Sequence, residues 1–157
     1  MKISFDEFNI NNVNHYNEFY NLNIEWLQTY FYVEDHDKEV LNNPKKYIID
    51  KGGIILFVLV NNMVIGTVAL MPTLSENTYE LTKMAIKPDL RGKKIGQKLM
   101  TKIIRLAKIK KINKLILYSN RKLKNAIHLY KKFNFKEIDL EEYTPYKRAN
   151  IKMELII

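Results

Sequence analysis

The sequence predicts a single domain of the α/β (α+β) class, in which helices cover both faces of a mixed sheet. Stretches whose apolar residues recur at three- and four-residue steps, as in helices, alternate with short apolar runs of strand length. This order of elements favours layers packed around one sheet. The chain has 157 residues, of which 46% are hydrophobic and 27% are charged. A chain of this size and composition can bury one core, so we expect one domain over residues 1–157.

The N-terminal part is expected to be mainly helical. Aromatic and apolar side chains recur at helical spacing over residues 12–32, and a second short helix is expected over residues 37–42, with Pro44 ending it. Residues 45–50 fit either a helix or an irregular segment. Residues 2–5 could supply a first strand ahead of these helices.

Strands and helices alternate in the rest of the chain. Gly52-Gly53 marks a turn, and the apolar run 54–60 is followed by the tight-turn signal Asn61-Asn62 and a strand over 64–71, which together predict a hairpin. The remaining elements expected from the pattern are a strand at 78–87, a helix at 95–110, a strand at 115–119, a helix at 123–133, and strands at 136–140 and 151–157.

The composition excludes several kinds of site. The chain has no cysteine, which excludes disulfides, thiolate metal sites and a cysteine nucleophile. His15 and His36 have no second ligand at metal spacing, so no metal site is expected. No apolar run approaches the length of a membrane span, and the N-terminus lacks the shape of a signal peptide. We therefore expect a cytoplasmic protein with no membrane partner.

The net charge of +9 is distributed unevenly. Residues 83–136 contain 18 Lys and Arg against one acid, Asp89, whereas residues 1–50 contain four Lys against nine acids. A basic half of this kind attracts an anionic ligand. Compositional bias toward Lys, Asn and Ile is a second explanation, and nucleic-acid binding is a third. No RNA-binding or helix-turn-helix signature is present, so we expect no nucleic-acid partner.

The segment Leu81–Met100 carries the most specific pattern in the chain. An apolar strand is followed by a Pro-containing turn and by the basic loop Arg91-Gly92-Lys93-Lys94-Ile95-Gly96, which opens directly into an amphipathic helix. Small residues at such a turn let the backbone approach a ligand, and the free N–H groups of a helix start favour anions. The pattern therefore predicts a phosphate cradle. It matches neither the P-loop nor the dinucleotide fingerprint.

This loop resembles motif A of the GNAT (GCN5-related N-acetyltransferase) superfamily, whose Arg/Gln-x-x-Gly-x-Gly/Ala sequence cradles the pyrophosphate of acetyl-CoA. Lys94 stands where the family usually has its first glycine. This substitution is tolerable if the backbone of Lys94 stays in a region open to non-glycine residues. The resemblance implies cofactor contacts from the loop residues Arg91, Gly92, Lys93, Lys94, Ile95 and Gly96.

The segment 119–135 is similar to motif B of the same family, A-x-x-L-Y-x-K-x-G-F. The matching residues are Ala126, Ile127, Leu129, Tyr130, Lys132, Phe133 and Phe135. Asn134 replaces the usual glycine, and Asn is the other residue that readily takes the left-handed conformation that closes a helix. The family's usual Asn is Leu123 here, so either Asn120 or Asn125 is expected to supply its cofactor contact.

The resemblance implies the GNAT fold, with a central mixed, mostly antiparallel sheet, and an acetyl-CoA-dependent N-acetyltransferase that releases CoA. The acceptor would be a primary amine, on a small molecule or a peptide, that attacks directly in a ternary complex. The family places the carbonyl-polarising backbone groups at Met84, Ala85 and Ile86. A gap between the strands of Met84 and Leu117 would admit the cofactor.

Two residues are candidates for proton transfer. Tyr130 matches the motif B tyrosine and is the candidate general acid for the leaving thiolate, with packing against the sheet as the alternative. Glu80 is the candidate general base, directly or through water. It could equally be a solvated carboxylate on a polar strand face shared with Thr78 and Thr82.

The acceptor is expected near the N-terminal helices and the loop around Tyr146. Trp26 and Tyr30 precede the carboxylates of Glu34, Asp35 and Asp37, a combination that could bind a cationic amine. Core packing for the aromatics and helix-start positions for the acids are the alternative.

Two other functions and one assembly stay open. The chain could be an inactive GNAT-fold module that binds or senses CoA, or a nucleic-acid-binding protein that uses its basic half. A homodimer could form if the final strand were an exposed sheet edge.

Overall fold

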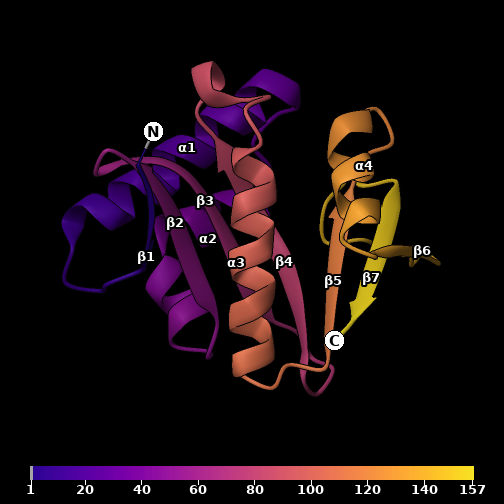
Figure 1. The fold of residues 1–157 in the computed structure, drawn as a ribbon. Helices are drawn as coiled ribbons and strands as arrows, with labels where there is room; N and C mark the ends of the chain where they lie inside the picture. Colours follow the sequence, from indigo (N-terminus) through magenta and orange to yellow (C-terminus); the bar gives the residue numbers. More distant parts are fainter. Residues whose placement is uncertain (1) are drawn as a thin grey trace.

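The computed structural model describes residues 2–157, which form one seven-stranded sheet in the order β1-β2-β3-β4-β5-β7-β6 (Figure 1). The strands are β1 (Ile3–Glu7), β2 (Ile54–Val60), β3 (Met63–Pro72), β4 (Thr78–Ile86), β5 (Lys114–Ser119), β6 (Lys136–Ile138) and β7 (Ile151–Ile156). All neighbouring strands are antiparallel except β4 and β5, which are parallel. The predicted fold class, a mixed and mostly antiparallel sheet, is confirmed.

Helices cover both faces of this sheet, also as predicted. They are α1 (Val13–Tyr30), α2 (Asp35–Asn42), α3 (Ile95–Ile109) and α4 (Lys124–Lys132). A π-helical turn at Lys45–Ile49 occupies the segment that fitted either helix or coil, and a short 3-10 turn at Pro88–Leu90 was not predicted. Every other expected element is present within a few residues of its predicted ends. No helix in residues 2–157 combines the length and apolar character needed to cross a membrane.

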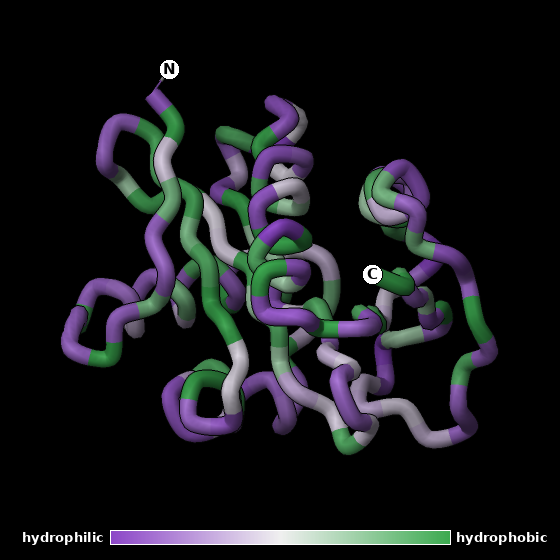
Figure 2. Tube along the Cα trace, turned by 60° about the horizontal axis from the view of Figure 1, so that its bottom comes forward, coloured by the Kyte–Doolittle hydropathy of each residue, from purple (hydrophilic) through white to green (hydrophobic). Residues whose placement is uncertain are grey.

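Strand β2 explains how one run of apolar residues serves two cores. Side chains alternate between the faces of a strand. Leu56 and Val58 point into the core beneath α3 and α4, whereas Ile55 and Phe57 point into the core formed with α1 and α2. Figure 1 shows α3 and α4 on the near side of the sheet and α1 and α2 on the far side. Figure 2 shows the central strands as mostly hydrophobic and the connecting loops as mostly hydrophilic.

Strands β4 and β5 are paired only at their beginnings. The register joins Thr78 with Lys114, Tyr79 with Leu115 and Glu80 with Ile116, after which the two strands diverge (Figure 1). The other edge of β4 stays paired with β3 as far as Ile86, across an irregularity in register. Lys83 lies in this stretch and has a φ of +55°, a local break in the regular strand. The predicted gap between the two motif-bearing strands is therefore confirmed.

The final strand is not an edge of the sheet. Strand β7 pairs with β5 from Ile151 to Ile156 and with β6 from Lys152 to Glu154. The expectation that β7 could be an exposed edge is wrong, because the short strand β6 folds back against it. The homodimer was suggested only because β7 might be an exposed edge, so this argument no longer holds. The edges of the sheet are β1 and β6.

Two residues that stand at glycine positions of the family motifs have left-handed backbones. Asn134 follows α4 with a φ of +72°, which confirms the expected helix-closing conformation. Lys94 has φ +62° and ψ +16° where α3 begins. Lysine was expected to be tolerated at position 94 only if its backbone adopted a conformation open to non-glycine residues. The left-handed backbone of Lys94 does not fulfil this condition. A left-handed residue with a Cβ costs about 1–2 kcal/mol, so the loop at Lys94 is strained.

Replacing Lys94 with glycine is expected to relieve this strain. We predict that Lys94→Gly raises the free energy of unfolding by about 1 kcal/mol, measured by urea denaturation. The matched control is Lys93→Gly, because Lys93 lies in the same loop without a positive φ. The control is expected to be neutral or destabilising. Equal effects of the two substitutions would contradict the assignment of strain to Lys94.

Candidate active site

A groove of about 800 Å³ opens where β4 and β5 diverge. The end of β4, the loop after it, the start of α3 and one side of α4 form its walls. Of the predicted cofactor residues, those that line this groove are Met84, Ala85, Ile86, Arg91, Gly92, Lys94, Ile95, Gly96 and Asn125. Lys93 and Asn120 are not among the lining residues. The structure thus brings together most of the two motif segments around one elongated space.

The start of α3 provides donors at one end of the groove. No side chain caps this helix end, so the N–H groups of its first turn have no partner within the helix. A Cβ added at Gly96 would lie 3.4 Å from both Leu129 Cδ2 and Met84 Cε. A longer side chain at Gly96 would therefore enter the groove. This end is suited to a phosphate group, because both the free donors and the helix dipole favour an anion.

The groove is lined by cations and by no carboxylate among residues 2–157. Its charged lining residues are Arg91, Lys94, Lys122, Lys124 and Lys132. Lys132 also donates a 3.1 Å hydrogen bond to Gln97 and so links α4 to α3 across the groove. Such a lining concentrates positive potential in a concave, partly desolvated space.

Arg91 connects this groove to α1. Its guanidinium is paired with Glu25, and its Cζ lies 5.4 Å from the centre of the Tyr30 ring. The Arg91 Nε is buried without a hydrogen-bond partner, and no other side-chain nitrogen or oxygen of residues 2–157 is in that state. An unmet buried donor costs about 1–3 kcal/mol, so this nitrogen is suited to a ligand acceptor.

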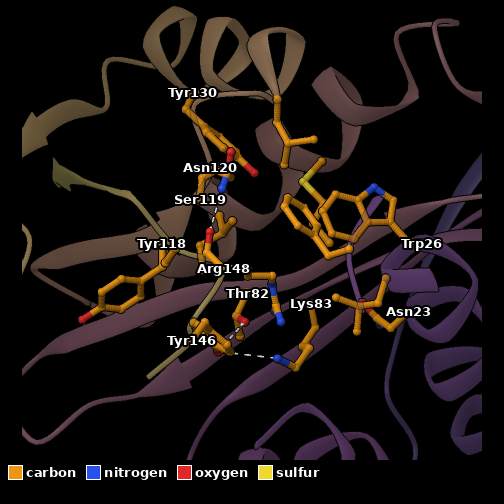
Figure 3. A pocket seen from close by; sticks show the side chains of 16 residues that line it. Asn23, Trp26, Thr82, Lys83, Tyr118, Ser119, Asn120, Tyr130, Tyr146 and Arg148 are labelled. Carbon is orange, nitrogen blue, oxygen red and sulfur yellow. Dashed lines mark hydrogen bonds between the residues drawn. The ribbon is translucent and has the colours of Figure 1, made fainter. Parts of the chain in front are cut away.

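A second, smaller cavity of about 80 Å³ lies further inside the molecule (Figure 3). Its walls come from α1, the diverging part of β4, the end of β5 and the loop before β7. Four residues line both spaces: Trp26, Met84, Leu123 and Tyr130. The groove and the inner cavity therefore meet at a boundary formed by these four side chains. Figure 3 shows Tyr130 on one side of the cavity, with Lys83 and Tyr146 on the opposite side.

Tyr130 stands at this boundary because α4 directs it toward the diverging strands. Its ring lies 6.0 Å from that of Phe135, which fixes its position on the sheet. Burial raises the pKa of the Tyr130 hydroxyl to about 12, so the group is protonated at neutral pH. Tyr130 thus packs against Phe135 and also lines both spaces, while its role as a general acid stays a prediction.

A polar network lies at the far side of the cavity. Tyr146 is buried, and its hydroxyl donates a 2.7 Å hydrogen bond to Glu80 and lies 3.2 Å from the Thr82 hydroxyl. Burial and the charge of Glu80 raise the pKa of Tyr146 well above its ordinary value. Lys83 donates a 2.9 Å hydrogen bond to Asp37, and its Nζ lies 4.7 Å from the centre of the Tyr146 ring.

Arg148 completes this network from the loop before β7. It donates hydrogen bonds of 2.6 and 3.0 Å to the two carboxylate oxygens of Asp37 and one of 3.0 Å to Glu34. Asp37 is fully buried. Burial alone would raise the pKa of Asp37, but the hydrogen bonds from Arg148 and the charge of Lys83 outweigh it and lower the pKa from 3.8 to about 2.

A model of the acetyltransferase (GNAT) family matches residues 20–135, which is most of this chain. The chain belongs to the GNAT family. An uncharacterized N-acetyltransferase of Dictyostelium discoideum is 35% identical over 66 residues, or 42% of this chain and 31% of that protein. One of Schizosaccharomyces pombe is 27% identical over 109 residues, or 69% of this chain and 67% of that protein. The chain thus spans only about a third of the Dictyostelium relative.

Solved GNAT structures share the fold. An acetyltransferase of Staphylococcus aureus Mu50 superposes with a TM-score of 0.83 at 24% identity, over 98% of each chain. The PaiA N-acetyltransferase of Thermoplasma acidophilum, solved in complex with coenzyme A, superposes with a TM-score of 0.75 at 22% identity over the whole of both chains. The predicted membership of the GNAT family is confirmed.

Within this GNAT fold the predicted acceptor residues are divided between the two spaces. Tyr146 lines the inner cavity and Trp26 lines both spaces, but Tyr30 lines only the outer groove, beside Arg91. Trp26 and Tyr30 are one helical turn apart, yet Tyr30 lies closer to the end of α1. Tyr30 is therefore placed with the predicted cofactor residues.

Of the two roles considered for the carboxylates after Tyr30, binding of a cationic amine and a structural role at the start of a helix, the contacts favour the structural role. Asp37 is neutralised by Lys83 and Arg148, and Glu34 accepts hydrogen bonds from the backbone N–H of Lys147 and from Arg148. Asp35 is exposed at the start of α2. These acids hold the structure together and do not line either space.

The alternative of a solvated polar face at Glu80 is also wrong. Glu80 is only 6% exposed, and Thr82 is buried beside it. Glu80 does not line the inner cavity, whereas Tyr146, which donates to it, does. The Tyr146 hydroxyl thus stands between the Glu80 carboxylate and the cavity.

Asn120 and His15 make structural hydrogen bonds in this GNAT domain. The Asn120 amide donates to the backbone oxygen of Arg148 at 2.7 Å and lines the inner cavity, so Asn125 is the one of the two that faces the groove. His15 is buried, and its Nδ1 accepts a 2.9 Å hydrogen bond from the Asn9 backbone. Residues 2–157 contain no cluster of three side chains able to hold a metal.

Sequence reasoning missed Lys83 and Arg148, which both line the inner cavity. Lys83 is one cation among many in the basic half, and its burial depends on Asp37, which lies 46 positions earlier. The interruption of an apolar strand by a lysine was the only available signal.

The ion pairs of Asp37 are expected to make stability depend on pH. The lowered pKa of Asp37 contributes about 2 kcal/mol, fully present above pH 3.8 and lost as the pH falls through about 2. We predict that the free energy of unfolding falls less steeply between pH 4 and pH 2 in Asp37→Asn than in the wild type, measured by urea denaturation.

Asp37→Asn is also expected to lower stability at pH 7 by about 3–5 kcal/mol, because it leaves two buried cations without their shared anion. The matched control is Asp35→Asn on the exposed face of the same helix, which should keep the wild-type pH profile. An unchanged acid slope in Asp37→Asn would contradict the assignment.

Proposed function

We propose that this chain is an acetyl-CoA-dependent N-acetyltransferase that moves the acetyl group to a primary amine by direct attack in a ternary complex. The observation that carries this proposal is the meeting of two spaces at Trp26, Met84, Leu123 and Tyr130. A cationic groove with a helix start at one end suits a phosphate-bearing donor, and the smaller inner cavity suits a small acceptor. Membership of the GNAT family and a structural neighbour solved with coenzyme A support it.

The groove fits acetyl-CoA in size, charge and available donors. Its volume of about 800 Å³ lies within the usual range of ligand pockets. Arg91, Lys94 and the first N–H groups of α3 would hold the phosphates. The edge of β4 that faces the gap has lost its pairing with β5 beyond Glu80, so Met84–Ile86 would pair with the amides of the ligand as an added strand does.

Bound acetyl-CoA would supply the acetyl group as an activated thioester. In the transfer, a bond forms between the amine nitrogen and the acetyl carbon, the carbon–sulfur bond breaks, and the sulfur leaves as a thiolate that takes up a proton. We assign Tyr130 as the acid group that donates a hydrogen bond to this sulfur, and any proton that it gives up would be replaced from solvent. A phenol of pKa about 12 is a weaker acid than a thiol of pKa about 8.5, so the hydroxyl acts mainly by donating a hydrogen bond to the departing sulfur.

The amine must lose a proton, and we assign Glu80 as the base through Tyr146. The Tyr146 hydroxyl already donates to Glu80 at 2.7 Å and lines the inner cavity. A proton accepted by the Tyr146 oxygen, with transfer of its own proton to Glu80, would leave the tyrosine as a phenol. Direct contact between Glu80 and the amine is disfavoured by the position of Tyr146.

Calorimetric titration of acetyl-CoA tests the groove. We predict micromolar binding by the wild type, a loss of about 10–100-fold in Arg91→Ala, and a larger loss in the Arg91→Ala/Gly96→Glu double variant. The matched control is Arg105→Ala on the exposed face of α3, which should bind as the wild type does. Failure of the folded wild type to bind would overturn the proposal, and binding without turnover of any amine would favour the inactive CoA-binding module.

The role of Tyr130 is tested by removing one oxygen atom. We predict that Tyr130→Phe lowers kcat by about 10²-fold in a thiol-release assay and leaves the affinity for acetyl-CoA within twofold of the wild type. The control is Tyr143→Phe, because Tyr143 is largely exposed on the loop before β7 and lines neither space. Equal rates for Tyr130→Phe and the wild type would reduce Tyr130 to a packing residue.

A further inference from the structure

We propose that the acetyl acceptor is a small amine that carries a carboxylate next to its amino group, as in a free amino acid, and that Arg148 and Lys83 bind this carboxylate. The inference rests on the proposed function and narrows its acceptor class. It assigns a binding role to two residues that the motifs of the family do not contain.

The charges that face the two spaces favour an acceptor with an anionic group. No Asp or Glu among residues 2–157 lines either the inner cavity or the groove, whereas Lys83 and Arg148 line the cavity. The acids of this region lie behind those cations, where Asp37 is fully buried. A polyamine or a lysine side chain would bring a second positive group into this cavity without a partner, which disfavours binding.

The two cations, Lys83 and Arg148, also retain free N–H donors for such a group. A guanidinium has five N–H donors, of which Arg148 uses two for Asp37 and one for Glu34. Lys83 uses one of its three donors for Asp37 at 2.9 Å and makes a long contact of 3.5 Å with Tyr146. Asp37 holds both cations at one place, and Figure 3 shows Arg148 and Lys83 on the same side of the cavity. A carboxylate placed there would meet two charged donors.

The size of the cavity limits the distance between the carboxylate and the amine of the acceptor. Its volume of about 80 Å³ is about a tenth of that of the groove. An acceptor whose carboxylate is bound in this small space has its amine a short distance away, near the boundary with the groove. A carboxylate and an amine that are separated by a long chain do not fit this arrangement.

The arrangement also orients the acceptor. The positive charges of Lys83 and Arg148 attract the carboxylate and repel the ammonium, which turns toward the opposite side while it stays in the small cavity that Tyr146 also lines. Tyr130 lies on that side in Figure 3, and Trp26 offers an aromatic face to a cation at the boundary with the groove. The amine is thus directed toward the place where the acetyl group would arrive.

Matched acceptors test the inference in a thiol-release assay with saturating acetyl-CoA. The panel pairs glycine, alanine, serine and methionine with their amides, and includes ethylamine and spermidine. We expect kcat/KM for at least one amino acid to exceed that of its amide by about 10-fold or more, which is about 1.4 kcal/mol of discrimination. Preference for amides, simple amines or spermidine would overturn the inference and leave the acetyltransferase proposal intact.

A parallel calorimetric titration of acetyl-CoA separates the two kinds of failure. Binding of acetyl-CoA without turnover of any amino acid would overturn the acceptor class alone. A folded protein that does not bind acetyl-CoA would overturn the proposed function itself.

Two substitutions test the residues. Arg148→Lys keeps the charge but loses the guanidinium fork, and Lys83→Gln removes a charge. Each is expected to reduce the ratio of kcat/KM between an amino acid and its amide by about 10-fold, with the KM for acetyl-CoA unchanged. This ratio does not depend on the fraction of protein that folds, so lost stability cannot imitate the effect. The control is Lys147→Gln at an exposed neighbouring position. Unchanged ratios in both variants would overturn the assignment.

Discussion

Strands β4 and β5 begin as hydrogen-bonded parallel neighbours and then separate, and both spaces of the candidate site lie where they separate. Three residue pairs join the strands at one end. Beyond Glu80 each strand keeps its other partner, β3 for β4 and β7 for β5, so neither loses its place in a sheet. The separation frees one edge of β4 and makes room for α4 to direct Tyr130 toward that edge. A regular seven-stranded sheet would fill this space with its own hydrogen bonds.

Charge is arranged in two layers around this opening. The outer layer faces the two spaces and contains only cations, including Arg91 in the groove and Arg148 in the inner cavity. The second layer does not line the spaces and contains the acids that hold these cations, the buried Asp37 for Arg148 and the more exposed Glu25 for Arg91. Buried ion pairs contribute little net stability, but removal of one partner is costly. The arrangement therefore fixes the direction in which each cation points.

The elements of this fold could be predicted from sequence because each has a local signal. The strands of the hairpin are bounded by Gly52-Gly53 and Asn61-Asn62, and α3 repeats its apolar residues at helical spacing. The arrangement of strand, loop and helix start that we propose as a phosphate cradle was also predictable, because the three segments are contiguous in the chain. The left-handed backbone of Asn134 followed from the residue type alone.

The inner cavity could not be predicted, because its side chains are brought together from distant parts of the chain. Arg148 meets Asp37 across 111 positions, and Tyr146 meets Glu80 across 66. No periodicity reports such pairs, so the sequence left open whether Asp37 binds an amine or only starts a helix, and whether Glu80 is a base or part of a polar face. The position of β7 between β5 and β6 was hidden for the same reason, because strand order is set by contacts distant in sequence.

That strand order has a consequence for biosynthesis. The strands β1 to β4, with α1 to α3, are complete once residue 109 has been made, and they contain most of both hydrophobic cores. Strand β5 can pair with β4 as soon as it is made, but β6 has to wait, because its neighbour β7 is translated after it. Since chains fold from the N-terminus as they leave the ribosome, the part up to residue 109 can form early. The candidate site is therefore assembled after most of both cores, because the inner cavity is complete only once Tyr146, Arg148 and Ala149 have been made.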